Sequence, residues 1–129
     1  MKKTITLLMA FSFTTLFASG VQNLTQTEKY KTLTTQYNLA IRYKNTTEDQ
    51  ENLANAFKLF HKSALKGYIP SQYELGLMFH YGNGVRQNAE LARLWLTRAA
   101  KKGHPQAQSI LYRFYSAKQP DIMNFRTDR

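Results

Sequence analysis

The sequence predicts an all-α protein made of stacked helix pairs, because it contains an internal repeat and apolar residues at helical spacing. Aligned with itself at an offset of 36 residues, the chain places Gln36-Tyr37 on Gln72-Tyr73 without a gap. The same offset places Lys66-Gly67 on Lys102-Gly103. A repeat of this length is typical of stacked supersecondary units that bury their apolar sides against one another.

Within each unit, the apolar residues predict the helices and the small residues predict their ends. Leu91, Ala92, Trp95 and Ala99 recur at the i, i+3, i+4 spacing of an amphipathic helix. Gly67 and Gly103 suit left-handed helix ends, and Pro70 and Pro105 suit the first turn of the helices that follow. We therefore expect five helices, at about residues 27–44, 48–66, 70–81, 88–102 and 105–116.

The two expected turns within the repeats differ in chemistry. Gly82-Asn83-Gly84-Val85 joins the third and fourth helices, with glycines that permit positive φ and a valine that can turn inward. In the first repeat, Thr47 and Gln50 instead form a possible capping box for the second helix. The acidic cluster around Asp49 suits a helix N-terminus better than a metal site.

The first twenty residues have the pattern of a signal peptide. Lys2 and Lys3 precede an uncharged, mostly apolar run from Ile5 to Phe17, and small residues end at Gly20. We expect cleavage between Gly20 and Val21, because Ala18 and Gly20 supply the small residues that a signal peptidase requires. A membrane anchor is the alternative, which the apolar run is too short to favour. The mature protein is then expected in the periplasm or outside a bacterial cell.

Composition limits the possible functions. The 129 residues suit one domain with a modest core, and the absence of cysteine excludes disulfides and thiolate chemistry. A net charge of +10 favours an acidic partner, and contact with a membrane surface is possible without spanning it. No cofactor, metal or nucleic acid is expected, because the three histidines lack partner ligands and the aromatic residues are needed in the core.

Residues 71–106 contain four motifs in order: Ser71-Gln72-Tyr73-Glu74-Leu75-Gly76, Tyr81-Gly82-Asn83-Gly84-Val85, Ala92-Arg93-Leu94-Trp95-Leu96, and Ala99-Ala100-Lys101-Lys102-Gly103-His104. Together they resemble a Sel1-like repeat, a relative of the tetratricopeptide repeat. The likeness is weaker in residues 35–70, where Leu59 replaces tryptophan, and in residues 107–118, where Tyr112 replaces glycine. We expect a repeat domain over residues 21–118 and a tail over residues 119–129.

The resemblance implies a right-handed α/α solenoid of about two and a half repeats that serves as an adaptor or regulator in protein assembly. A protein that neutralises a toxin or enzyme, and a hydrolase of cell-wall material, are the alternatives. Catalysis is not expected, because the remaining carboxylates are scattered along the chain. Few repeats bury little surface, so a homodimer is possible.

Two surfaces are candidate binding sites. The concave face, lined by the first helix of each repeat, is the usual recognition surface of such solenoids. Positions expected there outside the core are Asn38, Arg42, Glu74, Met78, Tyr81 and Arg113. A basic stripe on the second helices is expected to comprise Lys58, Lys62, Lys66, Arg98 and Lys102. It could meet an anionic surface or an acidic partner, or it could simply be a solvated face.

Overall fold

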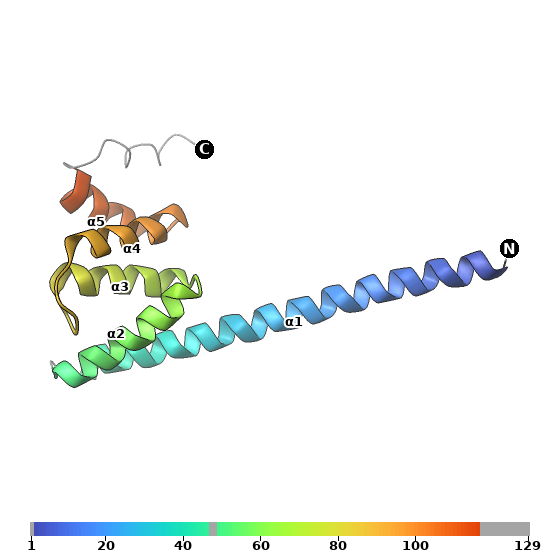
Figure 1. Cartoon of the computed structure of the whole chain (residues 1–129), viewed down its shortest axis with the longest axis horizontal. Coiled ribbons are helices and arrows are strands. Elements are labelled where there is room, and N and C mark those ends of the chain that lie inside the picture. Colours follow the sequence, from blue (N-terminus) through green and yellow to red (C-terminus); the bar gives the residue numbers. More distant parts are fainter. Residues whose placement is uncertain (1, 47–48, 117–129) are drawn as a thin grey trace. The chain divides into compact units, whose positions relative to one another are not determined.

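The computed structural model describes residues 2–46 and 49–116, with side chains from residue 23 onward. Its five α-helices are α1 (Lys2–Thr46), α2 (Gln50–Leu65), α3 (Ile69–Tyr81), α4 (Ala89–Lys101) and α5 (Pro105–Tyr115) (Figure 1). The predicted all-α class and the five helices are therefore confirmed. The chain divides into two units, Met1–Thr34 and Thr35–Arg129, which are described separately.

The helix that opens the repeats is the last part of α1, which also contains the described residues of the first unit. The expected start of that helix near residue 27 is wrong, because α1 already begins at Lys2. No proline interrupts the segment, and its threonines are accommodated in the helix by hydroxyl hydrogen bonds to the carbonyl four residues earlier. Thr27 bonds Asn23 in this way at 2.9 Å.

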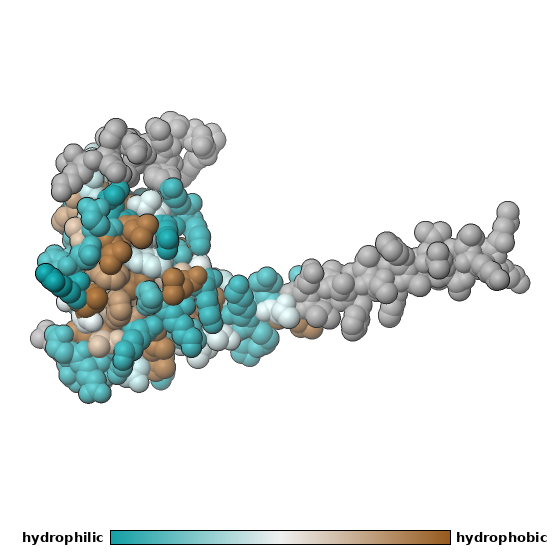
Figure 2. All heavy atoms as spheres, viewed as in Figure 1, coloured by the Kyte–Doolittle hydropathy of each residue, from teal (hydrophilic) through white to brown (hydrophobic). Residues whose placement is uncertain are grey.

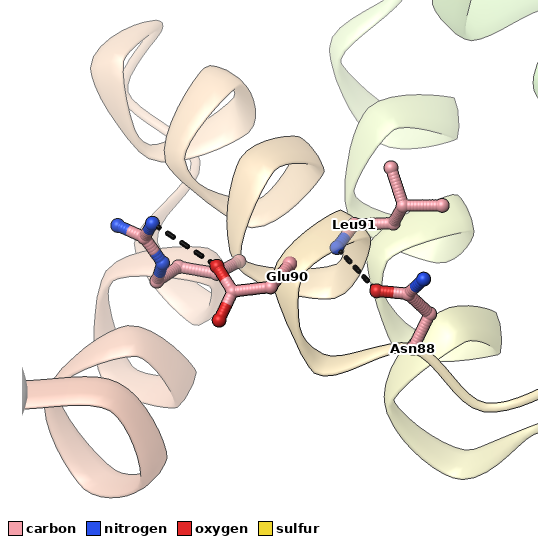
Figure 3. Close-up of polar contacts among 4 residues, drawn as sticks. Asn88, Glu90 and Leu91 are labelled. Atoms are coloured by element: carbon pink, nitrogen blue, oxygen red, sulfur yellow. Dashed lines mark hydrogen bonds and ion pairs between the residues drawn. The ribbon is translucent and has the colours of Figure 1, made fainter.

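The helix ends of the second unit follow local chemistry. Asp49 caps α2 by accepting the N–H of Glu51 at 3.2 Å, so α2 begins at Gln50 and not at residue 48. The expected capping box partner Thr47 lies outside the described residues. Asn88 caps α4, its Oδ1 accepting the N–H of Leu91 at 3.0 Å (Figure 3). The predicted glycine ends after α2 and α4 are confirmed by φ values of +89° and +88°.

The core lies where α3 packs between α2 and α4, and α4 in turn packs on α5 (Figure 1). Phe60, Leu96 and Leu111 are fully buried there. A Cβ on Gly76 would lie 2.7 Å from Cγ of Leu96, so α3 and α4 approach too closely for a larger residue. Tyr112, at the equivalent position of α5, is a large residue and is 66% exposed.

The loop between α3 and α4 is held against α2. Gly82 ends α3 in the left-handed conformation, and its N–H donates to the carbonyl of Met78 at 2.8 Å. A Cβ on Gly84 would lie 2.4 Å from the carbonyl oxygen of Leu53 in α2. Val85 packs against the core as expected. The loop thus depends on a glycine at the point where it touches the preceding repeat.

Apolar side chains also reach the surface of the second unit. Figure 2 shows them in small groups separated by hydrophilic residues. The exposed large side chains of this unit include Leu65, Tyr81, Leu94 and Phe114. Scattered groups of this kind are common on folded proteins, so each one needs a separate argument before it is assigned a role.

Candidate functional site

The first helices of the two repeats and the following helix α5 lie next to one another. We call their surface the first-helix face; it comprises residues 35–46 of α1 together with α3 and α5. Lys44 of α1 forms an ion pair with Glu74 of α3, with 2.7 Å between Nζ and Oε2. His80 of α3 forms a hydrogen bond with Tyr115 of α5, with 2.6 Å between Nδ1 and the hydroxyl oxygen. These contacts join three helices into one continuous surface.

An aromatic contact recurs from one repeat to the next along this face. The rings of Tyr37 and Tyr68 meet edge to face, with centroids 5.6 Å apart. At the equivalent positions, Tyr73 stacks on His104 with centroids 4.3 Å apart. Each first helix therefore packs a tyrosine against the residue that precedes the next first helix. Because Tyr68 and His104 are the N-cap residues of α3 and α5, each contact connects one first helix to the start of the next.

Glu74 is the carboxylate at the centre of this face. Its side chain is 11% exposed, whereas that of its partner Lys44 is 31% exposed. Burial raises the pKa values of Tyr37 and Tyr73, and the negative charge of Glu74 raises both further. Both phenols are therefore held more firmly in the protonated form than an exposed tyrosine is.

His104 has a structural role at the start of α5. Its Nδ1 accepts the N–H of Ala107 at 3.4 Å, which requires that nitrogen to be unprotonated. Burial lowers the pKa of His104, while the charge of Glu74 acts in the opposite direction. The imidazole is therefore a neutral N-cap at physiological pH.

The residues expected on the concave face divide into two groups. Asn38, Arg42, Tyr81 and Arg113 are exposed and available to a partner. Met78 is only 1% exposed and Glu74 only 9%, so their expected position outside the core is wrong. The reason is that α3 is covered by helices on both sides, which buries more of its circumference than a single-helix pattern indicates.

Three sets of contacts on this face were not predicted from the sequence: the Lys44–Glu74 ion pair, the aromatic contacts of Tyr37 and Tyr73, and the His80–Tyr115 hydrogen bond. The 36-residue offset could have found the aromatic contacts, because it places Tyr37 on Tyr73 and Tyr68 on His104. The offset does not show which helices pack together, so it could not have predicted the Lys44–Glu74 pair or the His80–Tyr115 hydrogen bond.

All five residues of the expected basic stripe are exposed. Lys102 donates a hydrogen bond from Nζ to the carbonyl of Gly67 at 3.3 Å, which ties the end of α4 to the turn after α2. The guanidinium of Arg98 lies over the ring of Trp95, 4.6 Å from its centroid. The stripe is therefore anchored to the helices beneath it at two points.

Metal binding and membrane spanning can be examined over the described part of the chain. Within residues 2–46 and 49–116, no three His, Cys, Asp or Glu residues are grouped so that they could hold a metal ion. None of the helices in that part combines the length and apolar composition required to cross a bilayer. His61 stacks on Phe57, with centroids 5.8 Å apart, as an ordinary packing residue.

Comparison with known proteins places this architecture in a family. A protein of Schizosaccharomyces pombe described as chitin synthase regulatory factor 3 is 43% identical over 51 residues, which cover 40% of this chain and 6% of that protein. A protective antigen of uropathogenic Escherichia coli, whose crystal structure displays an SLR fold, is 35% identical with a TM-score of 0.61. That match covers 74% of this chain and 21% of the antigen. This chain thus matches only a small part of each relative.

A family model described as Sel1 repeat matches residues 35–68 and 69–104. These two segments cover more than half of the chain, and they coincide with the helix pairs that share the aromatic contacts described above. The predicted solenoid of Sel1-like repeats is confirmed. The chain therefore belongs to the Sel1 repeat family, whose repeats mediate protein–protein interactions.

Proposed function

We propose that this protein is exported to a bacterial envelope and binds a partner protein through its first-helix face, as an adaptor or regulator. One observation carries the proposal: the first helices of two Sel1 repeats and of α5 are joined into one continuous surface. The Schizosaccharomyces pombe relative is described as a regulatory factor of chitin synthase, and this description fits a role as a regulator.

The chemistry of the face favours a partner with acidic groups. Arg42 and Arg113 are exposed at its two ends, with Tyr81 58% exposed between them. Arginine and tyrosine are enriched at protein interfaces because they combine a broad apolar surface with hydrogen-bond donors. Glu74 adds little negative charge, because Lys44 neutralises it.

Crosslinking tests the face directly. A photoreactive amino acid at Arg42, Tyr81 or Arg113 should capture the same protein from all three positions, identified by mass spectrometry. Probes at the exposed Lys62 and Arg98 on the second helices are the control. The purified partner should also bind an Arg42→Glu/Arg113→Glu variant at least about tenfold more weakly, because an acidic partner would then meet repulsion. Capture only from Lys62 and Arg98 would contradict the proposal.

Export has its own test. The leader pattern of Lys2 and Lys3 followed by an apolar run supports cleavage after Gly20. Expression in a bacterium, followed by fractionation and intact-mass measurement, should then give a periplasmic or secreted protein that begins at Val21. Recovery of the chain in the cytoplasm with its first twenty residues intact would rule export out and leave the binding proposal standing.

A further inference from the structure

The outward side of α2 and α4 carries a regular arrangement of cations and leucines. We call it the basic grid, and it consists of Lys58, Lys62 and Leu65 on α2 with its C-cap Lys66, and Leu94, Arg98 and Lys101 on α4 with its C-cap Lys102. Each set follows the i, i+4, i+7, i+8 spacing of one helix face, and the 36-residue offset superimposes the two sets. All eight residues are exposed.

The grid has no acidic residue to balance its six cations. The carboxylates of α2, α4 and their caps lie at the opposite end of these helices, at Asp49, Glu51 and Glu90. Glu90 already pairs with Arg93, at 3.3 Å between the charged atoms (Figure 3). The C-terminal halves of α2 and α4 therefore present concentrated positive charge to solvent.

Side-chain contacts make the grid continuous across the two repeats. Lys102 of α4 bonds the carbonyl of Gly67, next to Lys66 of α2. The ring of His61 in α2 meets Trp95 in α4, with centroids 6.2 Å apart, and Arg98 covers the same tryptophan. The cations of the two helices thus form one surface and not two separate clusters.

The two leucines distinguish this surface from a merely solvated one. Leu65 is 62% exposed and Leu94 is 43% exposed, each among lysines or arginines. An apolar side chain among cations is the composition of surfaces that lie at the boundary between lipid head groups and acyl chains. Lysine and arginine also have apolar stems that can follow leucine into such a boundary.

We infer that the basic grid docks the protein on an anionic phospholipid surface, with Leu65 and Leu94 entering the head-group region. The lipid phosphates would pair with the six cations, and the lipid head groups would surround the two leucines. This role goes beyond the proposed protein binding, because it uses the second helices and leaves the first-helix face free.

Vesicle binding by the full chain tests the inference. Co-sedimentation should be strong with vesicles of phosphatidylglycerol mixed with phosphatidylcholine and weak with phosphatidylcholine alone. The variant Lys58→Gln/Lys62→Gln/Lys101→Gln should bind on the order of a hundredfold more weakly, since each cation near an anionic surface contributes roughly fivefold. The control Lys29→Gln/Lys31→Gln/Arg86→Gln removes the same charge from exposed positions elsewhere and should lose less than about fivefold.

The leucines give a second readout. Leu65→Ser/Leu94→Ser should lower the part of binding that survives high salt, because that part depends on apolar insertion. Every variant keeps the leader segment, so the differences between variants belong to the substituted residues, and circular dichroism checks the fold. Equal losses in the two lysine variants, or equal binding to both vesicle types, would overturn the inference. Binding of an acidic polypeptide but not of vesicles would assign the grid to an acidic protein instead.

Discussion

Gly84 shows how a single residue fixes the contact between a loop and the preceding repeat. Its φ of +68° lies in the left-handed region, and a Cβ would meet the Leu53 carbonyl oxygen at 2.4 Å. Two costs therefore coincide at this position, a backbone strain and a collision with main chain that cannot rotate away. At Gly103, φ is +88° but nothing lies within 4 Å of the added atom, so only the first cost applies.

We expect Gly84→Ala to lower the free energy of unfolding by about 2–4 kcal/mol, the sum of backbone strain and overpacking. Gly103→Ala should cost only ~1 kcal/mol, because it carries the strain alone. Urea unfolding followed by circular dichroism measures both values. Equal losses in the two variants would mean that the loop does not press on α2.

His104 links the start of α5 to the pH of the solution. Its Nδ1 must be unprotonated to accept the N–H of Ala107, and burial lowers its pKa in the folded protein. The unfolded chain takes up this proton near the ordinary value of 6.5, whereas the folded chain resists it to lower pH. Between those two values the unfolded state binds more protons, so stability is lost as the pH falls through that window.

The variant His104→Asn should remove this part of the pH dependence, because asparagine keeps an N-cap acceptor and does not titrate. Urea midpoints of wild type and variant, measured from about pH 8 to about pH 5, should diverge below the ordinary histidine pKa, with wild type losing more stability. Parallel curves for the two proteins would show that His104 does not contribute.

Local signals predicted most of the helices, and the remainder depended on how the helices stack. Gly67 and Pro105 mark their helix ends in the sequence as they do in the structure. The start of α1 at Lys2 was missed, because Asn23 and Thr27 are of the type that caps a helix, whereas in the structure they lie inside α1. The burial of Glu74 and Met78 was missed because it comes from neighbours on both sides of α3, and a single-helix pattern contains no information about them.

The whole stack determines how much each repeat contributes. Leu39, Leu75 and Leu111 occupy equivalent positions of the three first helices, yet Leu39 is 43% exposed while Leu75 and Leu111 are fully buried. In a solenoid each unit is covered by its neighbours, so identical residues differ in burial according to their position in the stack. Leu39 lies near the start of the second unit, where no helix pair of that unit comes before it, so one side of Leu39 stays exposed.

We therefore expect Leu111→Ala to cost about 2–5 kcal/mol, as for a buried leucine that leaves a cavity, and the matched Leu39→Ala to cost ~1 kcal/mol or less. So few repeats should unfold together, because no helix pair can bury its apolar side alone. Urea curves from circular dichroism and from the fluorescence of Trp95 in α4 should consequently coincide, even in Leu111→Ala. If Trp95 lagged behind the helix signal in Leu111→Ala but not in wild type, α5 would be unfolding by itself, and the repeats would be coupled less tightly than the His80–Tyr115 and Tyr73–His104 contacts imply.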